Sequence, residues 1–353
     1  MLKYSSHSKS KTVLTIAALS AAAMLTGCGA SGENISQGMQ SIQNLDYQSA
    51  LDSFEKARAG GENERRIYRG MGIAYMGMTE YAQAAECFEN ALRLSGGVVE
   101  SMDYDLNFYL AAAYTRSGEL EKAETTYNSI LTMKPGAEDA YFLRGNVRLG
   151  LGKYEEAQAD FDKAAALSPQ NYDRLIQIYE VLSHYGYTEA GQLYLQNAIQ
   201  KEDGRMSAYD KGRIYFYLGD YQQAAAQLEE AKEKSGAQAY LYLGKAYEAT
   251  GDYNYASSVY NAFLSKDTSN AEIYNQLGLC EIAKGDYEKA LAAFQAGMNV
   301  ENNAVMQSLS FNEIVAYEYL GEFKKAAVLM ETYLQNYPDD EKAKREYGFL
   351  QTR

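Results

Sequence analysis

Residues 68–91, YRGMGIAYMGMTEYAQAAECFENA, hold two short amphipathic patterns separated by a break. In the first half, packing residues recur every three or four positions from Tyr68 to Tyr75, and in the second half they do so from Ala84 to Ala91. This spacing places the side chains on one face of an α-helix. The stretch therefore predicts two helices joined by a short turn.

The triplet of small, large and small residues that ends this stretch recurs along the chain. Its other copies begin at Ala50, Ala123, Ala157, Gly191, Ala224, Ala256, Ala290 and Ala326. Successive copies begin 34, 39, 34, 34, 33, 32, 34 and 36 residues apart. A period of this length is the signature of a helical array in which each unit packs only on its neighbours.

This pattern resembles the tetratricopeptide repeat, a helix-turn-helix unit of about 34 residues. The resemblance implies an all-α fold, a right-handed α-solenoid of about nine such repeats with a C-terminal capping helix. We expect repeats 1–2 at residues 35–98, repeats 3–9 at residues 104–340 and the capping helix at residues 341–353. Glycines such as Gly118 and Gly285 fall between the two halves of a repeat, where a helix end often needs a left-handed residue.

The first 28 residues have the organisation of a lipoprotein signal peptide. Three lysines precede an apolar run at residues 12–24, which is shorter than the roughly 20 residues that span a bilayer. The Leu-Thr-Gly-Cys segment that follows resembles the lipobox of bacterial lipoproteins, which implies a signal peptide at residues 1–27 and a lipid on Cys28. Residues 28–34 would then form a lipid-anchored tether. An ordinary secretory signal with a chance cysteine is the alternative.

The rest of the chain offers little catalytic chemistry. His184 is its single histidine, which excludes a Ser-His-Asp triad and a histidine pair for a metal. Cys87 and Cys280 lie six repeats apart, so we expect buried thiols and no disulfide. Residues 103–107 begin like a calcium loop, but Phe108 stands where the loop needs a glycine. We therefore predict no catalytic residue, no metal site, no cofactor and no enzymatic activity.

In tetratricopeptide proteins the first helices of successive repeats line a concave surface that holds segments of other proteins. The resemblance assigns these candidate partner-binding residues to that surface: Arg66, Arg69, Phe108, Phe142, Asn146, Tyr209, Arg213, Phe216, Lys245 and Phe311. Aromatic residues with isolated cations suit a peptide that has hydrophobic anchors and some acidic character. For each residue, packing on a neighbouring helix is the competing interpretation.

The formal net charge of −14 makes nucleic acid an unfavourable partner, because its phosphates would be repelled. We expect a lipid-anchored scaffold on the extracytoplasmic face of a bacterial cell membrane or outer membrane. There it would bind protein partners of unknown identity in a cell-envelope assembly. The alternative is a surface receptor that captures a soluble peptide or glycan.

Overall fold

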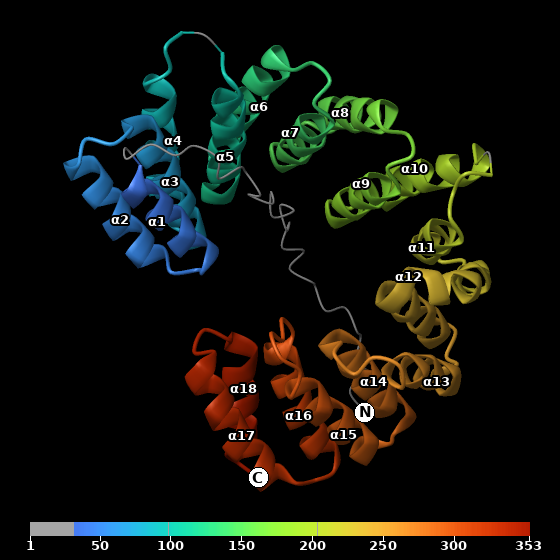
Figure 1. The fold of residues 1–353 in the computed structure, drawn as a ribbon. Coiled ribbons are helices and arrows are strands. Elements are labelled where there is room, and N and C mark those ends of the chain that lie inside the picture. Colours follow the sequence, from blue (N-terminus) through green and yellow to red (C-terminus); the bar gives the residue numbers. More distant parts are fainter. Residues whose placement is uncertain (1–31, 98, 203) are drawn as a thin grey trace. The chain divides into compact units, whose positions relative to one another are not determined.

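The computed structural model describes residues 32–97, 99–202 and 204–353, and all regular elements in these ranges are α-helices (Figure 1). The predicted signal peptide at residues 1–27 and the predicted lipid acceptor Cys28 lie outside the described residues. The chain divides between Ala140 and Tyr141 into two compact units, which we call the N-terminal body and the C-terminal body.

The N-terminal body contains three helix pairs. Its helices are α1 (Glu33–Gln43), α2 (Tyr47–Ala59), α3 (Glu64–Gly77), α4 (Tyr81–Arg93), α5 (Ser101–Ser117) and α6 (Leu120–Met133). Glu33 and Asn34, which we assigned to the tether, belong to α1. The Glu62 carboxylate accepts hydrogen bonds from the backbone N–H groups of Asn34 and Ile35, both at 3.1 Å. These N–H groups have no partner inside the helix, so Glu62 stabilises the earlier helix start.

The division between the bodies falls inside α7 (Glu138–Gly150), most of which belongs to the C-terminal body. The helices that follow are α8 (Tyr154–Leu167), α9 (Tyr172–His184), α10 (Thr188–Gln200), α11 (Ala208–Leu218), α12 (Tyr221–Ala249), α13 (Tyr253–Leu264), α14 (Ala271–Lys284), α15 (Tyr287–Met298), α16 (Met306–Tyr319), α17 (Phe323–Asn336) and α18 (Glu341–Leu350). From α8 onward, consecutive helices pack on one another, and α18 packs on α17 at the end of the array.

Helix α12 combines the second helix of one repeat with the first helix of the next. The chain kinks at Gly236, where φ is 63° and ψ is −151°. That backbone conformation is open almost only to glycine. Counted on either side of the kink, the described helices form nine pairs and the final helix α18. This all-α architecture of paired helices confirms the predicted fold class.

Close contact within a pair depends on a small residue that faces the large residue of the triplet. An ideal Cβ at Gly278 would lie 2.2 Å from the buried ring of Phe294, and one at Gly72 would lie 2.5 Å from that of Phe88. In the fifth repeat the small residue, Gly191, is on the second helix. An ideal Cβ at Gly191 would lie 3.0 Å from Cα of Tyr179 on the first helix. The triplets therefore mark the places where two helix axes come together.

The first helices of neighbouring repeats also contact each other. These contacts join α1 to α3 and α3 to α5 in the N-terminal body, and α9 to α11, α12 to α14 and α14 to α16 in the C-terminal body. First helices that touch across repeats form the inner side of a local bend. We call this surface the first-helix face, and it carries the candidate site.

Candidate partner-binding face

Helix α11 is held against α12 by one side and presents its other side on the first-helix face. An ideal Cβ at Gly212 would lie 2.5 Å from Cγ of Leu228, so this side of α11 lies flat on the first half of α12. Tyr209, Arg213 and Phe216 are spaced four and three residues apart and share another side of the helix. The structure therefore brings these three predicted residues together.

Four rings gather at this point, and we call them the aromatic panel: Tyr209, Phe216 and Tyr217 from α11, and Tyr242 from α12. The ring centroid of Tyr242 lies 5.4 Å from that of Phe216, 6.1 Å from that of Tyr217 and 6.4 Å from that of Tyr209. The planes are steeply inclined, between 59° and 75°, which suits the charge distribution of aromatic rings. Each ring is only partly buried.

Arg213 lies against the panel. Its guanidinium carbon is 5.1 Å from the Tyr209 ring centroid and 5.8 Å from that of Tyr242. Its Nη2 donates to Oδ1 of Asp173 on α9 at 2.5 Å, and its side chain is 12% exposed. Burial opposes the charge of Arg213, but the hydrogen bond and negative charge of Asp173 outweigh burial and raise its pKa. The panel thus holds a cation through ring faces and a carboxylate.

A tyrosine hydroxyl links the panel to α9. The hydroxyl of Tyr217 donates to Oε1 of Glu180 at 2.9 Å and lies 3.2 Å from the hydroxyl of Tyr242. Burial, followed by the nearby Tyr242 and Glu180, raises the pKa of Tyr217. A tyrosine with a raised pKa keeps its proton at neutral pH, so it remains a donor to the carboxylate.

The other predicted cations lie mostly in ion pairs between repeats. Nε of Arg69 is 2.6 Å from Oδ2 of Asp105 in the N-terminal body, and Nζ of Lys245 is 3.9 Å from Oε1 of Glu272 in the C-terminal body. Arg66 is exposed. Our expectation of isolated cations is therefore wrong for Arg69, Arg213 and Lys245, because an acid on a neighbouring first helix neutralises each of them.

The structure places two candidate residues in the interior. Phe142 is 4% exposed and Asn146 is 9% exposed, so neither can meet a partner on this surface. Phe142 packs 6.0 Å from Phe161, and the guanidinium of Arg174 from the next repeat covers its ring at 4.2 Å. The prediction that Phe142 and Asn146 belong to the binding surface is therefore wrong. Their positions in the sequence did not reveal that neighbouring helices bury them.

Phe108 and Phe311 are partly buried and contact other rings. Phe108 meets Tyr104 and Tyr127, with centroid distances of 4.9 and 6.4 Å. Phe311 lies 5.7 Å from Tyr333, and the Lys342 ammonium from α18 sits 4.5 Å from its centroid. For both residues, packing on neighbouring helices explains the aromatic side chain.

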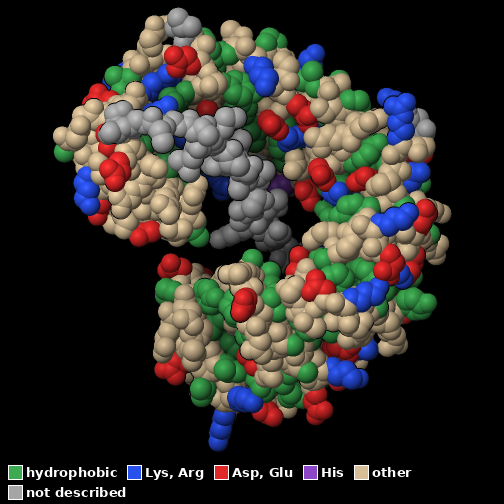
Figure 2. Space-filling view, viewed as in Figure 1, with side chains coloured by type: hydrophobic (Ala, Val, Ile, Leu, Met, Phe, Trp, Pro, Cys, Tyr) green, Lys and Arg blue, Asp and Glu red, His purple; other side chains and the backbone are tan. Residues whose placement is uncertain are grey.

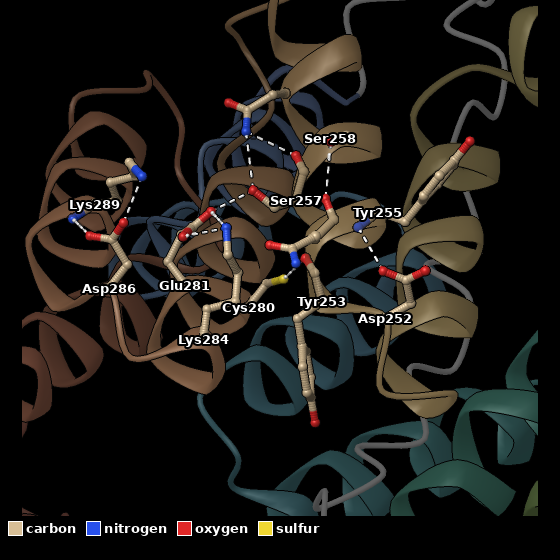
Figure 3. A network of polar contacts seen from close by, with 12 residues as sticks. Asp252, Tyr253, Tyr255, Ser257, Ser258, Cys280, Glu281, Lys284, Asp286 and Lys289 are labelled. Atoms are coloured by element: carbon tan, nitrogen blue, oxygen red, sulfur yellow. Dashed lines mark hydrogen bonds and ion pairs between the residues drawn. The ribbon is translucent and has the colours of Figure 1, made fainter.

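Another polar cluster lies between α13 and α14 and is structural (Figure 3). The buried Glu281 carboxylate accepts hydrogen bonds from the Ser257 hydroxyl and from Nζ of Lys284, the latter at 3.1 Å. The thiol of Cys280 donates to the carbonyl of Tyr253 at 3.2 Å, and burial raises its pKa to about 12. A thiol of this kind is unreactive at neutral pH. The prediction that Cys87 and Cys280 are free and buried is confirmed.

The described residues contain no candidate metal centre. Within residues 32–97, 99–202 and 204–353, no group of three or more His, Cys, Asp or Glu side chains could hold a metal ion. His184 is exposed at the end of α9.

Sequence reasoning missed Tyr217, Tyr242, Asp173 and Glu180. Tyr242 comes two residues before Gly244, about 200° away around the helix, so it lies on the side opposite the contact between Gly244 and Tyr260. Tyr242 contacts rings of the preceding repeat because of the angle between successive first helices, and this angle cannot be predicted from the sequence. The available signal was the concentration of tyrosines in both helices.

Comparisons with known proteins agree with this geometry. A model of the tetratricopeptide repeat matches residues 69–138, 209–264 and 243–298, and a second model of the same repeat matches residues 138–171. Together these matches cover more than half of the chain. The yeast Tom70 crystal structure superposes with a TM-score of 0.51 at 15% identity, covering 90% of this chain and 87% of that one. At this identity the likeness concerns the fold.

Two curated relatives match about half of the chain. A TPR repeat-containing protein of Methanocaldococcus jannaschii is 25% identical over 205 residues, which are 54% of this chain and 35% of the relative. Human RNA polymerase II-associated protein 3 is 24% identical over 199 residues, which are 51% of this chain and 28% of the relative. The chain thus spans about a third of the length of these relatives. With its repeat matches, its helix pairs and its superposition, this chain belongs to the tetratricopeptide repeat family, whose arrays are protein–protein interaction scaffolds.

Proposed function

We propose that this protein is a membrane-anchored, extracytoplasmic scaffold in a bacterial cell-envelope assembly, and that it binds a protein partner through the aromatic panel. The panel is the observation that carries the proposal. Its rings come from two repeats and lie on the first-helix face, and each remains partly exposed. Tyrosine and arginine are enriched among the few residues that carry most of the binding energy in protein interfaces.

The fixed position of the rings favours binding. Tyr242 contacts three other rings, and Arg213 is tied to Asp173, so little side-chain freedom remains to be lost when a partner arrives. Ordering a flexible side chain at an interface costs about 0.5–1.5 kcal/mol. A surface that is already ordered avoids most of this cost.

The anchoring part of the proposal rests on the sequence of residues 1–28. Lysines, an apolar run and a Leu-Thr-Gly-Cys segment stand in the order of a lipoprotein signal. Among the described residues, no helix combines the length and apolar character that a bilayer crossing requires. A lipid on Cys28 would supply membrane attachment, provided that two or more acyl chains are added.

Partner binding is tested by crosslinking in intact cells, capture of a tagged chain and quantitative mass spectrometry. The test variant is Tyr209→Ala with Phe216→Ala, and the matched control is Leu193→Ala with Tyr255→Ala, two side chains that are each 55% exposed on second helices. We expect the test variant to lose the partner by about tenfold, a loss of about 1.4 kcal/mol. The control should keep it.

Because Tyr209 and Phe216 are partly buried, a thermal melt must show that the double variant is folded. Equal capture by the folded test variant and by the wild type would overturn the panel as the binding site. Capture of a soluble peptide or glycan with no protein partner would favour a receptor instead of a scaffold.

Anchoring is tested separately by labelling cells with a radioactive fatty acid. We expect label on the wild-type chain and none on Cys28→Ala, which should leave the membrane fraction or accumulate as a precursor. Cys87→Ala is the control and should keep the label. An unlabelled wild-type chain in the soluble fraction would refute the anchoring proposal.

A further inference from the structure

The aromatic panel already binds the guanidinium group of Arg213, a side chain of the same protein. This contact indicates which chemical groups of a partner the panel can bind. Arg213 is held by the Tyr209 and Tyr242 rings and by Asp173, at the distances given above. It is therefore a guanidinium in an aromatic site that also contains a carboxylate. Sites of this composition bind ammonium and guanidinium groups through the negative ring faces and through ion pairing.

Acids outnumber cations at the panel. Asp173, Glu180 and Asp210 contact the panel or its cation, whereas Arg213 is the one base in these contacts. Asp173 is 70% exposed and uses Oδ1 for Arg213, and among the described residues nothing donates a hydrogen bond to its Oδ2. Glu180 uses Oε1 for the Tyr217 hydroxyl, and in the described part of the chain Oε2 accepts no hydrogen bond.

Two carboxylates with an open oxygen thus flank ring faces that are partly exposed. An arginine or lysine side chain could contact a ring face and a carboxylate together, which is how Arg213 is bound. A glutamate of a partner would meet the same two carboxylates and be repelled. Figure 2 shows acidic and basic side chains interspersed on the visible surface of the C-terminal body. The excess of acids at the panel comes from Asp173, Glu180 and Asp210.

We propose that the aromatic panel binds arginine or lysine side chains of a basic protein segment with apolar neighbours, its cations pairing with Glu180 and Asp173. The proposal rests on the proposed function, since it names the class of partner for the same surface. It reverses our expectation of a partner with acidic character, because the cations behind that expectation are already neutralised.

The test uses the purified full chain and two dye-labelled peptide probes of equal length. Both probes carry the same leucines and phenylalanines, and the charged positions are arginine in one and glutamate in the other. Fluorescence anisotropy at about 0.15 M salt, where the screening length is about 8 Å, reports affinity with long-range attraction reduced. We expect the arginine probe to bind at least about tenfold more tightly than the glutamate probe.

Two variants that each remove one negative charge test whether the arginine probe binds at the panel. Glu180→Gln should lower affinity for the arginine probe by about threefold or more, and it keeps an oxygen for the Tyr217 hydroxyl. Glu230→Gln removes an exposed acid from the second-helix part of α12 and should leave affinity unchanged. Thermal melts should show that both variants are folded.

Three results would overturn the inference: equal or tighter binding of the glutamate probe, equal losses in the two variants, or no binding of either probe. Equal losses would mean that the probe follows the net charge of the chain. These failures are distinct from failure of the proposed function. A captured partner that is lost on panel truncation but binds through an acidic segment would preserve the scaffold and refute the basic segment.

Discussion

The contact between Gly278 and Phe294 makes a quantitative prediction about the helix pair α14 and α15. An ideal Cβ at Gly278 would lie 2.2 Å from Cε1 and 2.6 Å from Cζ of Phe294, closer than the 3.0 Å limit that Cβ contacts respect. Phe294 is fully buried, so its ring cannot move into solvent. Gly278→Ala must therefore push the two helices apart.

The expected cost follows from two opposing effects. Alanine in place of glycine within a helix stabilises by about 0.5–1 kcal/mol. Overpacking a tight core costs about 1–3 kcal/mol. The midpoints of these two ranges give an expected net loss of about 1 kcal/mol in the free energy of unfolding for Gly278→Ala. The matched control is Gly348→Ala in α18, where a Cβ would meet nothing within 4 Å. The control should stabilise by about 0.5–1 kcal/mol.

Urea unfolding followed by circular dichroism measures both variants, and hydrogen exchange over α14 and α15 reports the local change. The second measurement is needed because repeat arrays can unfold in more than one step. Adding Phe294→Leu to Gly278→Ala should recover part of the loss, with a coupling of about 0.5–3 kcal/mol for side chains in contact. A Gly278→Ala protein at least as stable as the wild type would refute the proposed close contact.

Two further predictions concern the kink in α12 and the cap. Gly236→Ala should destabilise by about 1–3 kcal/mol in urea, because its φ of 63° strains any other residue although the space around it is open. Gly60→Ala, at φ −80°, is the control, and equal effects would refute the strain. Glu318 on α16 interacts with Glu346 on α18, and burial followed by Glu346 raises the pKa of Glu318 from 4.5 to about 7. A raised pKa in the folded state contributes stability that is present below about pH 4.5 and lost as the pH rises through about 7. The urea midpoint of the wild type should therefore fall more between about pH 6 and about pH 8 than that of Glu318→Gln, and equal falls would contradict this assignment.

The fold was predictable because its determinants are local and repeated. Two features recur at a regular spacing in the sequence. One is a glycine opposite an aromatic ring, as at Gly278, and the other is a glycine in a turn, such as Gly285 at φ 83°. Leu45 and Thr79 adopt the same turn at φ 60° and 63° without a glycine, so composition alone does not locate every turn. The continuous helix α12 was also hidden, because a single glycine replaces the loop between two repeats.

The site was less predictable because it depends on contacts between repeats. Tyr209, Arg213 and Phe216 share a helix side through spacing alone, and the structure brings them together. Which side chain of the next repeat covers them is decided by the angle between first helices. That angle brings Tyr242 onto Tyr209, three residues before Gly212, and Arg174 onto Phe142, three residues before Gly145. Equivalent positions consequently become part of a partly exposed panel or of a buried core.

The abundance of tyrosine has a physical consequence for the partner. The chain has 47 acidic and 33 basic residues and also 33 tyrosines. Several carboxylates therefore meet a tyrosine hydroxyl, as Glu180 meets Tyr217 at 2.9 Å and Asp162 meets Tyr194 at 2.7 Å. A hydroxyl donates a hydrogen bond but carries no charge, so it orders the carboxylate without neutralising it. An ion pair would have cancelled the charge, as between Arg69 and Asp105. Tyrosine thus leaves an ordered negative charge beside the panel, and a basic segment is the partner that this charge favours.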